Sequence, residues 1–252
     1  MSLKKYGHLT LEANEDKSFY TVINCERDAQ EVSIPLFTDG IPIHRIEEEA
    51  FKHCKKLRSL VFLDGNENDP LYHTGLEIDD YAFSYLDALE TVELPYTLNT
   101  YIGRGAFYYC TSLSKISFSP YTTVSAYAFH HCESLIDIPK ISDIDEGTFG
   151  FCYKLPTLPI TENIRVISED CFEHCYALKE IIIPKSVKRI EALAFRNCRG
   201  LTRVSFEETK GWYSSNSYRD HDVEIDVSDP ELMAKELAGM DFDDGTIAWY
   251  RK

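Results

Sequence analysis

The sequence ISEDCFEHCYALKEIIIPKSVKRIEALAF, residues 167–195, contains one complete copy of a motif that recurs along the chain. The apolar positions of this copy are Ile167, Phe172, Cys175, Leu178, Ile181 and Ile183. At about 100° per residue, a helix over residues 167–178 gathers the first four on one side. The spacing then changes to two, which predicts a short strand that ends at Pro184, since proline cannot donate a ladder hydrogen bond. Each copy therefore predicts one short helical turn followed by one short strand.

Seven phenylalanines anchor seven copies of this motif and lie 20 to 32 residues apart. They are Phe51, Phe83, Phe107, Phe129, Phe149, Phe172 and Phe195. Isoleucine or valine stands five residues before each of them, and leucine stands six residues after each of them. Copies of this length that each have one apolar face must stack to bury it. We therefore predict an α/β fold, a solenoid of about seven short helix–strand units with a parallel sheet.

The consensus I-x4-F-x2-C-x2-L-x2-I-x-I-P resembles the BspA-like leucine-rich repeat family of bacterial surface proteins. Ile190, Phe195, Cys198 and Leu201 match it in phase, and the resemblance covers Ile41 to about residue 206. It implies a leucine-rich-repeat solenoid. It also implies adhesion or protein–protein interaction at a bacterial surface, with binding through the face of the solenoid.

The chain is expected to have three parts. Residues 1–40 alternate apolar and polar side chains around a turn, which predicts a hairpin-like β cap, and residues 41–206 form the solenoid. Residues 207–252 form a small α+β cap. A capping box at Ser228 and Glu231 predicts a helix from about Pro230 to Gly239, with Met233, Leu237 and Met240 on one side. A strand is expected over residues 246–250. Caps are needed because a terminal repeat would otherwise expose an apolar face and an unpaired strand edge.

The charge balance narrows the class of partner. The formal net charge is −16, which argues against nucleic acid or an anionic membrane surface. No run of about 18 apolar residues is present, so we predict no membrane insertion. No hydrophobic signal segment follows Met1, so localisation stays open between the cell surface or secretion, as the resemblance implies, and the cytoplasm. We expect a monomer.

Six of the eight cysteines occupy one position of the motif, three residues after phenylalanine. They are Cys54, Cys110, Cys132, Cys152, Cys175 and Cys198. The second copy has Leu86 there, so the position accepts a medium-sized apolar side chain, a role that free cysteine fills well. We predict buried free thiols rather than disulfides.

The longest interval between copies contains a polar stretch, Asp64 to Gly75, that invites a calcium interpretation. Asp64, Asn66 and Asn68 match the first spacings of an EF-hand loop. The match then fails, because Asp69 stands where the loop requires glycine and Gly75 stands where it requires glutamate. A solvated loop is therefore the better interpretation.

Histidines beside the motif cysteines are the other candidate metal ligands. His130 and His131 precede Cys132, but other copies carry lysine, tyrosine, arginine or asparagine there, so we interpret both as outward-facing repeat positions. The chain has no C-x2-C pair, no H-E-x-x-H motif and no phosphate-binding glycine loop. We predict no catalytic activity, no cofactor and no metal site.

The residues that alternate with the buried aliphatics of each strand form the predicted binding face. The candidates are Ser59, Val61, Thr91, Glu93, Lys115, Ser117, Asp137, Glu180, Ile182 and Arg203. Their mixed chemistry suits a protein partner, since a repetitive polymer would favour the same side chain on every rung. Two alternatives stay open, an intracellular adaptor and a glycan-binding surface made by the C-terminal aromatic side chains Trp212, Tyr213, Trp249 and Tyr250.

Overall fold

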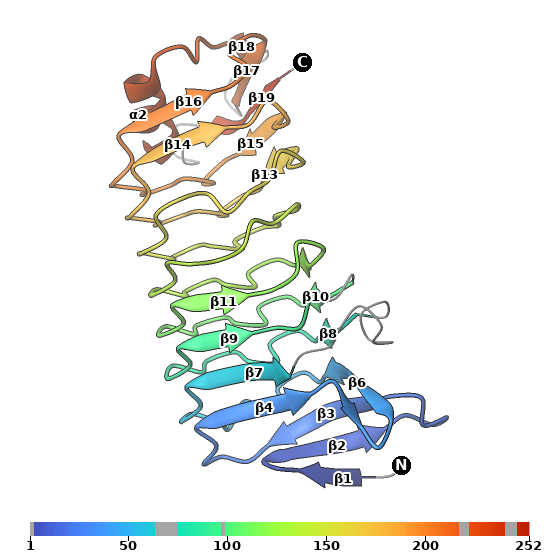
Figure 1. Ribbon diagram of the computed structural model, residues 1–252. Helices are drawn as coiled ribbons and strands as arrows, with labels where there is room; N and C mark the ends of the chain where they lie inside the picture. Colours follow the sequence, from blue (N-terminus) through green and yellow to red (C-terminus); the bar gives the residue numbers. More distant parts are fainter. Residues whose placement is uncertain (1–2, 64–74, 97–98, 217–221, 240–245, 252) are drawn as a thin grey trace.

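The computed structural model describes residues 3–63, 75–96, 99–216, 222–239 and 246–251, and its chain winds into a solenoid of about seven turns (Figure 1). The turns stack along one axis, with β1 (Leu3–Tyr6) at one end and α2 (Pro230–Gly239) at the other. The predicted solenoid is confirmed. The predicted helix in each unit is wrong, because α2 is the only helix among the described residues and it lies outside the repeats.

The strands that the sequence predicted form a first strand series along one side of the solenoid (Figure 1). Its members are β4 (Glu31–Pro35), β7 (Ser59–Leu63), β9 (Thr91–Glu93), β11 (Lys115–Ser117), β14 (Glu180–Ile183) and β16 (Arg203–Phe206). Four of them pair in parallel in the order β11-β9-β7-β4, and β14 pairs with β16 in a separate sheet. Ile181 and Ile183 point into the core, and β14 ends before Pro184 as expected.

A second strand series lies where a helix was expected, at the residue five positions before each phenylalanine. Its members are β6 (Ile41–Ile46), β8 (Glu77–Ile78), β10 (Tyr101–Ile102), β12 (Thr123–Val124), β13 (Val166–Ile167) and β15 (Arg189–Glu191). They pair in parallel as β6-β8-β10-β12 and, separately, as β13-β15. Five of the seven repeats thus contribute two short strands, so the sheets carry more of the fold than the sequence indicated.

Tight turns connect the two strand series, and they occupy the segment predicted to be helical. The backbone N–H of each motif phenylalanine from Phe51 to Phe172 donates to the following repeat, as from Phe83 to the carbonyl of Ala106 at 2.9 Å. A donor used between repeats cannot serve the i→i−4 bond of a helix. Tyr81 and Tyr85, two residues before and after Phe83, also have left-handed backbones, with φ of 55° and 59°.

The seven phenylalanines form one column through the core. All seven rings are fully buried, and the centroids of consecutive rings lie 4.6 to 5.7 Å apart. From Phe83 to Phe195 the rings are nearly parallel, with interplanar angles of 7° to 12°. Stacked aromatic rings are worth about 0.5–1.5 kcal/mol per pair beyond the area they bury. The column therefore joins every repeat to its neighbour.

A parallel column of cysteines confirms the predicted buried free thiols. All eight cysteines are free and buried. The thiol of Cys152 donates to the carbonyl of Phe129 at 3.3 Å, and that of Cys175 to the carbonyl of Phe149 at 3.2 Å. Leucine cannot make this bond, so cysteine both fills the position and pairs a buried carbonyl of the preceding repeat.

The N-terminal segment contains a quasi-repeat that the sequence did not reveal. β1, β2 (Leu9–Ala13) and β3 (Tyr20–Cys25) form an antiparallel meander, as a β cap should. However, β3 also pairs in parallel with β6, and β4 pairs in parallel with β7. The two-residue β5 (Phe37–Thr38) pairs with β6. The sequence predicted only a β cap here, because this rung of the solenoid lacks the phenylalanine and has Ala29 where the motif has leucine.

The C-terminal end closes the solenoid with strands and α2. β19 (Thr246–Arg251) pairs antiparallel with β15 and with β17 (Trp212–Asn216), which pairs with β18 (Val223–Glu224). The predicted helix and strand are confirmed, but Asp229 and not Ser228 caps the helix, accepting the N–H groups of Glu231 and Leu232. Met233 and Leu237 are buried as expected, whereas Met240 lies outside the described residues.

Both strand series are interrupted at the same place. Residues 125–165 are all described, yet they contain no strand, only the isolated bridges of Asp137 to Lys115 and of Ile141 to Ile160. In the first four repeats and the seventh, the residue after the motif leucine donates its N–H to the preceding rung, as from Ile136 to the carbonyl of Ser114 at 3.1 Å. Pro156 occupies this position in the fifth repeat and has no N–H to give. The first strand series therefore opens between β11 and β14.

Candidate functional site

The ten candidate residues lie on one face of the first strand series, which we call the sheet face. Strand register aligns Ser59, Thr91 and Lys115 in one row, and Val61, Glu93 and Ser117 in the next. The remaining four are Asp137 in the first row and, beyond the interruption, Glu180, Ile182 and Arg203. All ten are exposed or half-buried, whereas the residues between them belong to the core.

Neighbouring rungs of the sheet face pair with one another. Lys115 Nζ lies 3.6 Å from a carboxylate oxygen of Asp137, and the hydroxyl of Thr91 donates to that of Ser59 at 3.3 Å. Arg203 reaches Glu231 of α2 at 3.7 Å. Exposed ion pairs of this kind contribute little stability, typically 0–1 kcal/mol. These side chains can therefore exchange their present partners for those of another protein at small cost.

The sheet face has a hollow of about 320 Å³ at the interruption of the first strand series. Leu158, Ile181 and Ile182 are among its apolar lining residues, and Ile182 exposes 63% of its surface. Ligand sites begin at roughly this volume. Two of the ten candidates, Glu180 and Ile182, belong to this hollow, and the other eight lie outside it.

Acidic side chains surround the opening of the hollow. Glu162, Glu180 and Glu207 line it together with a single cationic side chain, Lys140. One carboxylate oxygen of Glu207 accepts the backbone N–H of Lys185 at 3.0 Å, which holds that side chain in place. Three carboxylates and one ammonium give the hollow an excess of negative charge. Sequence reasoning missed this group, although Pro156 and Pro159 signal the break in the strands that creates it.

The strand that borders the hollow has one unpaired edge. In β14 the carbonyls of Lys179 and Ile183 accept N–H groups from the following repeat, at 3.2 Å from Arg203 and 3.1 Å from Glu207. Carbonyls of alternate residues point to opposite edges of a strand. Those of Glu180 and Ile182 therefore point to residues 157–160, and within the described part of the chain no backbone N–H bonds to them.

A row of stacked aromatic and histidine rings runs along the turns, at the position two residues after the motif phenylalanine, and we call it the turn edge. Tyr85, Tyr109, His131, Phe151 and His174 stack there in sequence, with centroid distances of 5.4, 3.9, 4.2 and 4.4 Å. Each inner ring, from Tyr109 to Phe151, is stacked on both faces by its neighbours, so these rings mainly hold the repeats together. His131 of this row and the adjacent His130 are half-buried rather than outward-facing, and the sequence interpretation needs this correction.

Burial controls the protonation of His131 and His174 in the turn edge and of the adjacent His130. His130 stacks on Tyr108 at a centroid distance of 5.3 Å, and desolvation, followed by repulsion from His131, lowers its pKa to about 4. Desolvation also lowers the pKa values of His131 and His174. These imidazoles are therefore neutral at physiological pH.

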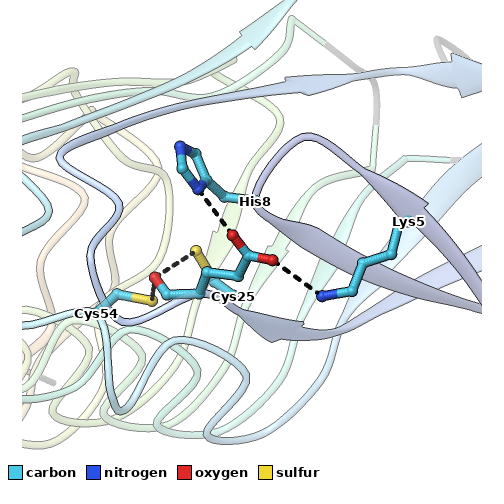
Figure 2. A network of polar contacts seen from close by, with 5 residues as sticks. Lys5, His8, Cys25 and Cys54 are labelled. Atoms are coloured by element: carbon cyan, nitrogen blue, oxygen red, sulfur yellow. Dashed lines mark hydrogen bonds and ion pairs between the residues drawn. The ribbon is translucent and has the colours of Figure 1, made fainter.

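The described residues bring together one group of potential metal ligands, His8, Glu26 and Asp28, whose ligand atoms lie within 4.8 Å of one another. Figure 2 shows the Glu26 carboxylate between His8 and Lys5, with both contacts at 3.2 Å. The Lys5 ammonium already neutralises this carboxylate. The arrangement is that of a surface ion pair beside the N-terminal strands, since a cation would have to displace the lysine.

Beneath this ion pair lie two thiols of the core. The Cys54 thiol donates to the carbonyl of Glu26 at 3.3 Å, and Cys25 lies beside it, as Figure 2 shows. The neighbouring Cys54 thiol and burial raise the pKa of Cys25. The same contact with Cys25 lowers the pKa of Cys54, and both cysteines are free.

The C-terminal aromatic residues do not form the glycan surface that was kept as an alternative. Trp212 is 1% exposed and Trp249 is 5% exposed, and the indole N–H of Trp212 donates to the carbonyl of Glu208 at 2.8 Å. Tyr213 and Tyr250 are half-buried and stack at 5.9 Å. Both tryptophans are part of the core of the cap, so they offer no face to a sugar ring.

Two further expectations concern the rest of the chain. Residues 64–74, most of the segment considered for calcium, lie outside the described residues. Gly75 is described and has a left-handed φ of 78°. Within the described part of the chain, no helix combines the length and the apolar character required to cross a bilayer.

Comparison with known proteins places the repeats in a family. A family model described as BspA type leucine rich repeat region matches residues 76–202 in six copies, just over half of the chain. The chain belongs to this family of BspA-type leucine-rich repeat proteins. Its first copy, around Phe51, precedes the matched region but stacks in the same column. No curated protein sequence matches the chain.

The chain is similar to solved structures of leucine-rich repeat proteins. A leucine rich cell surface protein from Faecalibacterium prausnitzii A2-165 is 21% identical, with a TM-score of 0.53 over 84% of this chain and 56% of that protein. A leucine-rich repeat protein from Bacteroides ovatus is 15% identical, with a TM-score of 0.38 over 81% and 89% of the two chains. The T. pallidum leucine rich repeat protein is 20% identical, with a TM-score of 0.37 over 81% and 71%. The first of these similarities shows a shared fold.

Proposed function

We propose that the chain is a non-catalytic protein-interaction module that binds its partner through the sheet face. The proposal rests on the mixed chemistry of that face. Its rows are in register and present hydroxyl, carboxylate, ammonium and aliphatic side chains, and the exposed Ile182 lies beside the hollow. Protein interfaces combine such polar rims with apolar anchors. Membership of a leucine-rich repeat family supports the same class of function.

The biological setting of this module belongs to the proposal as well. We propose adhesion or protein binding at a bacterial surface, since a similar structure carries the description of a cell surface protein. An intracellular adaptor is the second candidate for the setting, and the same sheet face would serve it.

Site-specific cross-linking tests which face binds. A photoreactive amino acid at Ser117, in the centre of the sheet face, should capture one protein from a host-surface extract or a bacterial lysate. The matched control carries the same group at Tyr176, an exposed residue of the turn edge side, and should capture nothing specific. Specific capture only from Tyr176 would contradict the proposed face.

Substitution provides the second test. Replacement of Lys115, Glu180 and Arg203 together by alanine should abolish capture while the circular dichroism spectrum stays unchanged, because all three side chains are exposed. Capture that survives this change would remove these residues from the interface.

We also propose that the chain acts as a monomer, because both ends of the solenoid are covered by non-repeat strands and α2. Light scattering coupled to size exclusion should give a mass near 29.0 kDa. A concentration-independent dimer mass would contradict this prediction.

A further inference from the structure

We propose that the hollow at the interruption of the first strand series binds one arginine side chain of a protein partner. The proposal rests on the proposed function, because it identifies the anchor that the sheet face offers. Its starting point is the open edge of β14, where the carbonyls of Glu180 and Ile182 lack a backbone donor among the described residues. These carbonyls border a space of about 320 Å³.

The lining suits a side chain with an apolar stem and a cationic end. Leu158 and Ile182 offer aliphatic surface, and Ile182 is 63% exposed on a strand whose alternate residues are fully in the core. Long cationic side chains pack their methylene groups on such surface while their charge reaches a polar rim. Here that rim consists of the carboxylates of Glu162, Glu180 and Glu207.

Charge complementarity sets the sign of the ligand. Three carboxylates and a single ammonium, from Lys140, face the hollow, and the whole chain carries a net charge of −16. A cationic partner group therefore gains both local pairing and long-range attraction. An anionic or neutral group gains neither.

The number of acceptors favours arginine over lysine. A guanidinium offers five donors in one plane and is more weakly hydrated than an ammonium. The hollow offers carboxylate oxygens from three glutamates and the open carbonyls of β14, so several donors can be paired at once. A lysine ammonium has three donors around one point and would leave more of these acceptors unpaired.

The absence of the strand ladder explains why this site exists only here. In other repeats of the first strand series, an N–H such as that of Ser114 or Ile136 bonds the neighbouring carbonyl and closes the surface. Pro156 removes that donor in the fifth repeat. The proline opens the ladder toward the fourth repeat, and the carbonyls of Glu180 and Ile182 stay available because β14 has no strand partner among the described residues on the side of the fifth repeat.

The experiment titrates the isotopically labelled full chain with N-acetyl-arginine amide and follows backbone amides by NMR. We expect saturable shifts at Thr157, Glu180 and Ile182 and none at Thr91, on the same face but outside the hollow. N-acetyl-citrulline amide has the same shape without the charge, and it should cause no saturable shift. Equal shifts with citrulline, or binding of N-acetyl-lysine amide as tight as that of arginine, would overturn the assignment.

Variants separate this proposal from general surface charge. Glu180→Gln and Glu162→Gln should each weaken binding of the arginine probe by roughly fivefold, the range of a partly exposed ion pair. Glu93→Gln removes an equal charge from the sheet face outside the hollow and should leave the affinity unchanged. Affinity that falls equally in all three variants would show non-specific attraction and overturn the proposal.

The two proposals fail in different ways. If Ser117 captures a protein partner while the hollow variants keep full affinity for that partner and for the arginine probe, the hollow is not the anchor although the sheet face binds. If the probe binds the hollow but Ser117 captures nothing, the arginine site stands and the wider interface is wrong.

Discussion

Each column phenylalanine connects its repeat to both neighbours through different groups. The ring of Phe149 stacks between those of Phe129 and Phe172, at 5.6 and 5.7 Å. Its N–H donates forward to the carbonyl of Cys171 at 2.9 Å, and its carbonyl accepts the thiol of Cys175 at 3.2 Å. One residue type thus provides packing and two hydrogen bonds, which explains why the motif requires both phenylalanine and the cysteine three positions later.

The cysteine column leads to a prediction about thiol reactivity. Desolvation raises the pKa values of Cys110 and Cys198 to about 12, so the reactive thiolate is rare at pH 8. In the native chain a water-soluble thiol reagent should modify none of the eight cysteines quickly. In strong denaturant all eight should react. Rapid modification of several native thiols would contradict the buried column.

His130, which lies beside the turn edge, predicts that the stability of the chain depends on pH. His130 has a pKa of about 4 in the folded chain, against about 6.5 when unfolded, so the unfolded chain binds more protons between these values. The free energy of unfolding should therefore fall as the pH drops from about 6.5 to about 4, by less than about 1.4 kcal/mol per pH unit for this group.

Urea unfolding of the chain and of His130→Tyr at pH 7 and pH 5 measures this contribution. Tyrosine occupies the same position in the preceding repeat, as Tyr108, so the variant should fold and lose part of the pH dependence. An identical pH dependence in the two proteins would show that His130 is protonated in the folded chain.

At the scale of elements, the sequence predicted the first strand series well and the turns poorly. Alternation in the segment from Ile181 to Ile183, ended by Pro184, specifies a strand that the structure confirms. The apolar spacing of residues 167–178 fits a helix, but the same spacing also places side chains inward from consecutive turns. Hydrogen bonds between repeats decide between the two, and a single copy of the motif cannot reveal them.

The hollow and the second strand series were hidden for different reasons. Strands as short as β8, Glu77–Ile78, have no room to show a two-residue period. The ten residues of the sheet face could be chosen from the alternation alone. The lining residues Glu162 and Glu207 could not, because the break between β11 and β14 brings together residues that follow different strands.

The C-terminal cap gives a prediction at this scale. Trp212 is buried against Phe206 at a centroid distance of 5.0 Å, so Trp212→Ala should destabilise the cap by about 3–5 kcal/mol. The control, Tyr250→Phe, removes only the hydroxyl that donates to Asp222 and should change stability little. Hydrogen exchange should show the loss in β16, β17 and α2, while β7 and β9 keep their protection. Equal loss throughout the chain would contradict a local effect.

The whole molecule is a stack in which each repeat contacts mainly its neighbours, so its stability is a sum of repeat and interface contributions. The phenylalanine column, the cysteine column and the turn edge run through the fifth repeat without a break. Only the two strand series stop there. The fifth repeat is therefore held on its turn side and loosely paired on its strand sides.

This asymmetry predicts the pattern of amide hydrogen exchange. The amides of Thr157 and Ile160 have no strand partner that closes the first series, so they should exchange faster than that of Ile116 in β11. The amide of Phe149, bonded to Cys171, should remain protected and serves as the internal control. Uniform protection across the fifth repeat would show that the strand series are continuous in solution.

The shared interruption of the two strand series also bears on how a chain of this kind can change its length. Adding or removing one repeat between the fifth and sixth repeats would break no strand-to-strand hydrogen bond of the first series, because the bonds of Ile141 to Pro159 and Thr161 join the fifth repeat to the fourth. The turn contacts would form again, since the repeats from the third to the sixth present the same N–H, carbonyl, ring and thiol to their neighbours. The fifth repeat is therefore the position at which duplication of a sequence unit, in evolution or in design, disturbs the existing molecule least.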